Sequence, residues 1–180
     1  VDSDGDLITD TLEVEGFGGN VAQYLGDGIV VYFGYPRAHE NDAERAVRAA
    51  LEIMDVLQPL QQQFQRQYNL DLEIRIGINT GLVIAGKIGS DLHVEYTVIG
   101  NTVNLADRLQ SVADPGTVAV SFATYQHTQP FFEYQTLSPS TVKGKPQPIG
   151  AFRPAGLRSR PGQVRGLSGL RGPMIGRQNA

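Results

Sequence analysis

Two polar side chains, Asn104 and Arg108, give the first indication of chemistry in this chain. They lie four residues apart within the stretch VEYTVIGNTVNLADRLQ, residues 94–110, and this spacing places both on one face of a helix. An asparagine amide can hold a ribose hydroxyl or ether oxygen, and the planar guanidinium fork matches the charge that builds on phosphate oxygens during transfer. We therefore expect this helix face to carry the chemistry of the chain.

The elements that must position these side chains are a strand and the helix that follows it. Residues 94–98 are of strand-forming types and are followed by Gly100-Asn101, after which apolar residues recur with helical spacing at Val103, Leu105, Ala106 and Leu109. The pattern predicts a strand that gives way to an amphipathic helix at this point.

The composition limits the classes of protein to which the chain can belong. Its 180 residues, 41% of them hydrophobic, suffice for one domain of mixed class. A net charge of −4 disfavours a nucleic-acid groove, and no apolar run approaches the roughly eighteen residues of a membrane span. The chain has no cysteine, and because no charged-then-apolar stretch opens it we expect no secretory leader. We therefore expect a cytoplasmic protein that binds neither nucleic acid nor membrane.

An acidic segment, residues 1–15, differs in character from the rest. Leu7 stands at the sixth place of a possible twelve-residue calcium loop, where the sharp turn requires glycine. The segment is therefore either a Ca²⁺ site or an acidic, frayed terminus. Five carboxylates have the spacing of the first, third, fifth, ninth and twelfth loop positions: Asp2, Asp4, Asp6, Asp10 and Glu13.

Two hairpins are predicted in the first half of the chain. VAQYL and IVVYF are strand-like on either side of Gly26-Asp27-Gly28, which places Asp27 at a hairpin tip, where an aspartate can also serve simply to make the turn. Residues 72–79 alternate in polarity and, with the LVIAGKIG stretch that follows Thr80-Gly81, predict a second hairpin.

An amphipathic helix is predicted between these hairpins, and a linker at the end of the chain. Asn41 and Glu44 have the spacing of a capping box, and an apolar stripe runs from residue 46 to residue 57. Pro59 ends or bends this helix unless QPLQQQFQRQYN continues it towards Asn69. Residues 155–180 are rich in glycine, arginine and proline and have the composition of a basic linker.

Five blocks of this sequence resemble, in order, the catalytic domain of class III nucleotidyl cyclases. The resemblance covers residues 16–154 and implies an α+β, ferredoxin-like domain with an antiparallel-rich sheet, which works as a head-to-tail homodimer. It is similar in particular to bacterial adenylate cyclase domains that precede an ATPase and repeat module, and GLRGPMIGRQNA resembles the opening of that module. The blocks are GGNVAQYLGDGIVVYFGYP, DAERAVRAALEI, IRIGINTGLVIAGKIG, EYTVIGNTVNLADRL and VKGKPQP.

The resemblance implies roles for particular residues. Asp27 matches an aspartate that binds Mg²⁺ or Mn²⁺, and Asn104 matches the asparagine that orients the ribose. Arg108 matches the arginine that stabilises the transition state on the phosphates. Lys143 and Lys145 fall in the segment that supplies a lysine to the triphosphate, and either of them can be that lysine.

The positions that read the base fall on Gln23 and Thr97, where the resemblance leads one to expect lysine and aspartate. Adenine offers an acceptor at N1 and a donor at N6, and a glutamine amide can satisfy both, while threonine can donate or accept. Guanine presents the reversed pattern, which a flipped amide also meets. Gln23 and Thr97 are therefore compatible with ATP. We expect ATP as the substrate because the sequence as a whole resembles adenylate cyclases.

The front of the chain departs from the family pattern. The family begins with a strand that bears its first metal aspartate and with two helices, and too few residues precede Gly18-Gly19 for these elements. Asp10 is therefore not expected to replace that aspartate, and the domain is expected to be N-terminally incomplete. Three functions remain open: an adenylate cyclase, an impaired cyclase-like module that binds nucleotide or dimerises, and a calcium-binding interaction segment.

Overall fold

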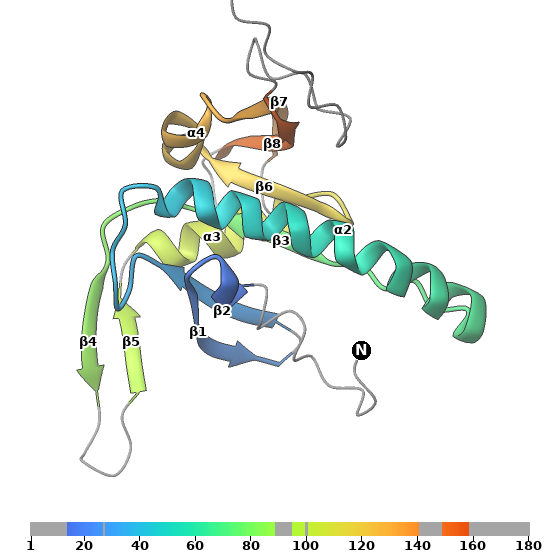
Figure 1. The fold of residues 1–180 in the computed structure, drawn as a ribbon, viewed down its shortest axis with the longest axis horizontal. Coiled ribbons are helices and arrows are strands. Elements are labelled where there is room, and N and C mark those ends of the chain that lie inside the picture. Colours follow the sequence, from blue (N-terminus) through green and yellow to red (C-terminus); the bar gives the residue numbers. More distant parts are fainter. Residues whose placement is uncertain (1–13, 27, 89–94, 100, 141–148, 159–180) are drawn as a thin grey trace, which may run out of the picture.

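The order of the elements is shown in Figure 1, a computed structural model that describes residues 14–26, 28–88, 95–99, 101–140 and 149–158. None of the helices in these ranges is both long enough and apolar enough to cross a lipid bilayer. The elements are β1 (Gly19–Leu25), β2 (Gly28–Phe33), α2 (Asp42–Tyr68), β3 (Arg75–Ile78), β4 (Ile84–Ile88), β5 (Glu95–Ile99), α3 (Asn101–Val112), β6 (Thr117–Ser121), α4 (Phe122–Thr128), β7 (Phe132–Ser140) and β8 (Ile149–Leu157).

A four-stranded mixed sheet forms the centre of the fold, in the order β3-β6-β8-β7. β6 is parallel to β3, and β8 runs antiparallel to both β6 and β7. All five residues of β6 are buried, as expected for an inner strand that is covered on both faces. Because β3 and β6 are parallel, a long crossover joins them, and this crossover contains the β4–β5 pair and α3.

Two helices cover opposite faces of this sheet. Val47, Ala50 and Met54 of α2 pack on Val118 and Val120 of β6 in one buried cluster. On the other face, α3 contributes Leu109 and Ala113 to a cluster with Ala119 of β6 and Ala151 of β8. Alternate residues of β6 thus face different helices, as the two-residue period of a strand requires.

The sequence left open whether the helix α2 ends at Pro59 or continues beyond it, and the structure shows the longer alternative. It runs through Pro59 and ends at Tyr68, with Asn69 in a left-handed C-cap conformation (φ 52°). Pro59 is exposed, so the carbonyl that it leaves without a helical partner can bond to water. Leu57 and Leu60, on either side of the proline, both pack in the same apolar cluster, and this contact supports the continuous helix.

The predicted capping box at the start of α2 is wrong. Asn41 is the N-cap residue, but its side chain makes no capping hydrogen bond. Asp42, the first residue of the helix, turns back instead, and its Oδ2 accepts a hydrogen bond of 2.7 Å from the backbone nitrogen of His39 in the preceding loop. Glu44 instead binds Arg48 one turn later, with an Nη2–Oε1 distance of 2.8 Å. The residue types have the correct spacing, but Glu44 binds Arg48 and does not reach back to the N-cap.

The first predicted hairpin is confirmed and the second is wrong. β1 and β2 pair antiparallel, and Leu25 lies opposite Gly28 at the turn. β3 and β4, by contrast, do not pair: β3 joins β6, and β4 pairs antiparallel with β5. The alternation of polar and apolar residues specified the strands, but an alternating pattern fits any partner that offers a matching apolar face.

The β1–β2 hairpin is attached to the rest of the fold by apolar side chains. Val21 of β1 and Val31 of β2 pack against a buried cluster that includes Ile53 and Leu57 of α2, together with Ile76 of β3. Within the described residues, the hairpin and the four-stranded sheet share no strand. Helix α2 therefore holds the hairpin against the sheet, as Figure 1 shows.

Tyr134 of β7 gives the fold a predictable response to alkali. Burial raises the pKa of Tyr134 above 10.0, and the hydrogen bond to Thr128 (2.6 Å) partly offsets this effect. A phenol that ionises less readily when folded contributes stability that is present below pH 10 and is lost as the pH rises through its folded-state pKa.

We expect the free energy of unfolding to fall less steeply above pH 10 in Tyr134→Phe than in the unsubstituted protein. At pH 8 the variant should be less stable by about 1 kcal/mol, because one hydrogen bond is lost. Urea unfolding between pH 8 and 11 measures both effects. Parallel pH curves for the two proteins would contradict the assigned role of Tyr134.

Candidate functional site

Helix α3 carries the two side chains that the sequence singled out. Asn104 is exposed and Arg108 is half-buried, with the Nε atom of Arg108 shielded from solvent. The apolar residues of the same helix, Leu105 and Leu109, pack in the cluster against β6 and β8. Residues four apart in a helix lie on the same face. The structure therefore places Asn104 and Arg108 on one face of α3, one helical turn apart, as predicted.

Contacts with backbone fix where α3 lies. Gly77 of β3 faces the helix so closely that a Cβ there would overlap the carbonyl oxygen of Ala106 and the backbone nitrogen of Gln110. At the start of the helix, the Thr102 hydroxyl donates to the Leu82 carbonyl (2.8 Å), and the Asn79 amide donates to the Thr102 carbonyl (3.0 Å). The turn of α3 that bears Asn104 is therefore tied to the segment between β3 and β4.

The predicted base-reading positions lie on two different strand pairs. Gln23 is exposed on β1, directly after a bulge that leaves Ala22 without a partner on β2. A bulge of this kind changes the direction of the side chains that follow it. Thr97 is in β5, where its Cα lies opposite that of Gly86 of β4.

The remaining predicted residues lie outside the described ranges. These are Asp27, Lys143 and Lys145, together with the carboxylates of the possible calcium segment, residues 1–13. On either side of Asp27 the structure does describe the chain, and there Leu25 pairs with Gly28 across the hairpin.

A site for Mg²⁺ or Mn²⁺ would need several oxygen ligands. In the part of the chain that the structure describes, no group of three His, Cys, Asp or Glu side chains lies close enough together to hold an ion. Asp27 supplies one carboxylate at most. The described side chains do not form a metal site by themselves.

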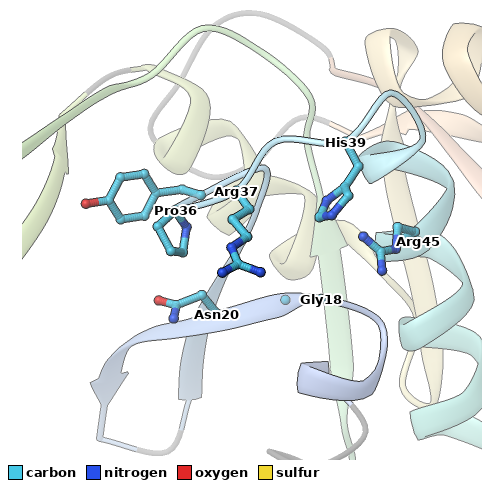
Figure 2. Close-up of a pocket in the computed structure, with 8 residues that line it drawn as sticks. Gly18, Asn20, Pro36, Arg37, His39 and Arg45 are labelled. Atoms are coloured by element: carbon cyan, nitrogen blue, oxygen red, sulfur yellow. The ribbon is translucent and has the colours of Figure 1, made fainter.

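A polar pocket of about 270 Å³ lies at the other end of the β1–β2 hairpin, and sequence reasoning missed it. Figure 2 shows the side chains of Arg37, His39 and Arg45 around the space next to Gly18 and Asn20. These residues come from the start of β1, the loop before α2 and the second turn of α2. The stretch PRAHENDAER holds two arginines and one histidine but also three acidic residues, so its composition did not indicate the pocket, and no spacing rule joins the three elements.

Comparison with known proteins identifies the family. The sequence profile of the adenylate and guanylate cyclase catalytic domain matches residues 14–153. Adenylate cyclase 1 from Rhizobium meliloti is 28% identical over 141 residues, which are 77% of this chain and 21% of that protein. The chain spans between 8% and 38% of the length of the first curated relatives that it matches.

Solved structures agree with this match. The adenylyl cyclase CyaB from P. aeruginosa superposes with a TM-score of 0.75 and 31% identity, covering 86% of this chain and 79% of that one. The guanylyl cyclase Cya2 gives a TM-score of 0.72 and 33% identity, with 83% and 76% covered. The α+β cyclase fold expected from the sequence is thus confirmed, and the chain belongs to the adenylate and guanylate cyclase catalytic domain family.

Proposed function

We propose that this domain is an adenylate cyclase, which converts ATP to cyclic AMP and pyrophosphate. The ribose 3′ hydroxyl attacks the α-phosphorus in line and releases its proton to solvent water, a new O–P bond forms, and the bond from the α-phosphorus to the bridging oxygen of the β-phosphate breaks as pyrophosphate leaves. The observation that carries the proposal is the pair Asn104 and Arg108, one turn apart on a helix whose position is fixed by Gly77.

The two side chains suit different parts of this reaction. Asn104 is exposed and carries both a donor and an acceptor, so it can orient the ribose for attack. Arg108 is half-buried, and a guanidinium held by the surrounding protein stabilises developing phosphate charge without reorganising. In this proposal, Lys143 or Lys145 binds the triphosphate.

The preference for ATP rests on Gln23 and on the likeness to adenylate cyclases. Gln23 is exposed beside a bulge, where its amide can donate to adenine N1 and accept from N6. The relatives include an adenylate cyclase from Rhizobium meliloti and a receptor-type guanylate cyclase from Caenorhabditis elegans. GTP is therefore the competing substrate that the assay must include.

We infer that two chains pair head to tail, so that Asn104 and Arg108 of one protomer complete a site with Gln23 and Asp27 of its partner. The support for this is that the predicted groups are divided between the β1–β2 hairpin and α3. We also propose that the acidic residues at the start of the chain and the basic residues after β8, which ends at Leu157 and not at residue 154, flank the catalytic domain, and that an ATPase module follows it.

The test is product formation by the purified chain with ATP or GTP in the presence of Mn²⁺ or Mg²⁺. We expect cyclic AMP with ATP, little cyclic GMP with GTP, and neither product from the Asn104→Ala, Arg108→Ala double variant. Cyclic GMP as the main product would overturn the proposed substrate. Nucleotide binding without product, by a chain with an intact circular dichroism spectrum, would show an impaired cyclase-like module instead.

A further inference from the structure

The polar pocket beside Gly18 has a lining that favours an anion. It is bounded by the start of β1, by the loop before α2, and by α2 itself. No acidic residue lines it, while two arginines and one histidine do; the lining consists of Gly18, Gly19, Asn20, Tyr35, Pro36, Arg37, His39 and Arg45. Because guanidinium groups stay charged at all physiological pH values, the lining carries at least two positive charges.

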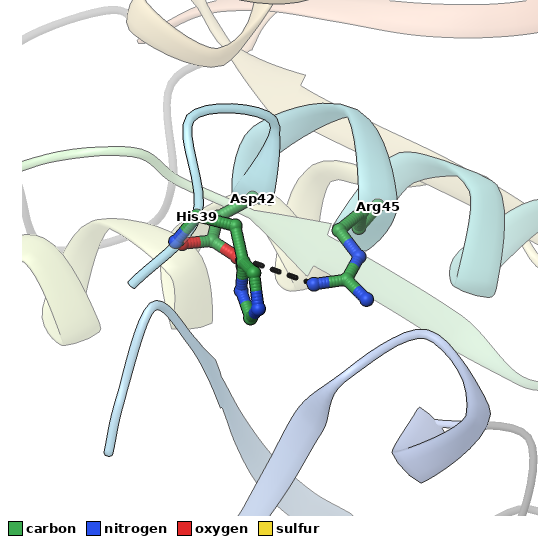
Figure 3. Close-up of polar contacts among 3 residues, drawn as sticks. All are labelled: His39, Asp42 and Arg45. Atoms are coloured by element: carbon green, nitrogen blue, oxygen red, sulfur yellow. Dashed lines mark hydrogen bonds and ion pairs between the residues drawn. The ribbon is translucent and has the colours of Figure 1, made fainter. Parts of the chain in front are cut away.

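The Asp42 carboxylate offsets part of this charge, because it forms a long ion pair with Arg45. Figure 3 shows Asp42 between His39 and Arg45. Its oxygens accept from the His39 backbone nitrogen at 2.7 Å and contact the His39 ring at 3.2 Å. The Arg45 guanidinium is farther away, with an Nη1–Oδ1 distance of 4.0 Å. The Asp42–Arg45 pair is therefore long, and no carboxylate among the described residues forms an ion pair with Arg37, so the lining keeps a net positive charge.

Arg45 has a buried donor atom without a hydrogen-bond partner in the described part of the chain. Its Nη1 atom is buried and donates no hydrogen bond among the described residues, although buried donors are nearly always satisfied. Gly18 has a positive φ of 78°, and a Cβ at this position would lie 2.9 Å from Nη1. Glycine therefore lets the backbone at residue 18 pass close to the guanidinium, and any side chain there would have to displace the end of Arg45.

We propose that this pocket binds the phosphate group of a small ligand. Arg37 and Arg45 approach one space from different elements, as Figure 2 shows, and a tetrahedral anion can accept from several directions at once. A volume of about 270 Å³ admits a phosphate with a small organic substituent and lies below the usual range for drug-sized ligands.

The phosphate pocket lies at the opposite end of β1 from the turn that leads into β2. Gly19 begins β1, whereas Leu25 ends it next to Asp27. The two ends of this strand are roughly 20 Å apart at the usual rise per residue. A ligand in the pocket is therefore too far away to share its phosphate with groups at the hairpin turn, and the proposal does not depend on cyclase activity.

The test uses the ¹⁵N-labelled 180-residue chain, titrated with inorganic phosphate at constant ionic strength and followed by NMR. We expect saturable shifts of the Gly18, Gly19 and Asn20 amides. Arg37→Gln, which changes an exposed side chain, should weaken binding about tenfold, because one charge-assisted hydrogen bond is lost. Arg66→Gln changes an exposed arginine near the end of α2 and should leave the affinity unchanged.

A second titration, with glycerol 3-phosphate, distinguishes a free phosphate from a phosphorylated small molecule. Tighter binding than that of inorganic phosphate would show that the substituent is also recognised, and equal or weaker binding would assign the pocket to the phosphate group alone. Shifts that stay linear, that arise in α3 instead, or that are equal in Arg37→Gln and the unsubstituted chain would overturn the proposal.

Discussion

Replacing Arg108 with alanine is expected to lower cyclic AMP formation by at least a factor of about one hundred. The side chain is half-buried on α3, where a fixed cation acts on developing charge in surroundings that are partly free of water. Removing one preorganised donor to a transition state typically costs about 10²–10³ in rate. Because the interaction strengthens in the transition state, we expect the loss in kcat to exceed any change in KM for ATP.

Steady-state cyclic AMP formation with ATP and Mn²⁺ measures this effect. Gln110→Ala is a matched control, because Gln110 is an exposed residue of the same helix and its substitution also shortens a side chain. We expect Gln110→Ala to retain activity within a few-fold. An Arg108→Ala protein that kept the original kcat would exclude Arg108 as a group that stabilises the transition state.

Gly77→Ala should be the most damaging single-methyl change in the described part of the domain. The added Cβ would overlap backbone atoms of Ala106 and Gln110, and backbone cannot rotate away as a flexible side chain can. Overpacking at rigid positions costs about 1–3 kcal/mol and sometimes more. We expect a loss at the upper end of this range, because α3 would have to move away from β3 as a whole.

Chemical denaturation measures the free energy of unfolding of this variant, and the cyclase assay measures its rate of cyclic AMP formation. Because α3 carries Asn104 and Arg108, we expect activity to fall even at temperatures at which the variant is fully folded. Gly150→Ala is the control, since a Cβ at residue 150 meets nothing within 4 Å. If Gly77→Ala matched the unsubstituted protein in both stability and activity, β3 and α3 could not lie as close together as they do in the structure.

Local elements of the fold were predictable because each carries its own pattern. The Gly26-Asp27-Gly28 turn indicated the β1–β2 hairpin, and the apolar spacing from Val103 to Leu109 indicated α3. Strand pairing was not predictable in the same way. The partner of β3 is β6, which follows much later in the chain, and the choice depends on two helices covering the sheet rather than on residues next to the strand.

The candidate site was predictable only where its residues share one element. Asn104 and Arg108 lie on a single helix, so their spacing alone indicated that they act together. The phosphate pocket joins Gly18, Arg37 and Arg45 from three elements, and their proximity depends on the packing of α2 against the β1–β2 hairpin. A sequence pattern records neighbours along the chain, and it does not record contacts that tertiary packing creates.

The attachment of the β1–β2 hairpin through α2 means that substrate choice and thermal tolerance cannot evolve independently in this domain. Ile53 and Leu57 set the distance between the hairpin that bears Gln23 and the sheet that supports α3. A mutation that changes the packing of Ile53 or Leu57 would move the hairpin, and with it Gln23, although neither residue is part of the proposed base pocket. Selection for a different nucleotide can therefore act on the hydrophobic core as readily as on the residues that face the substrate.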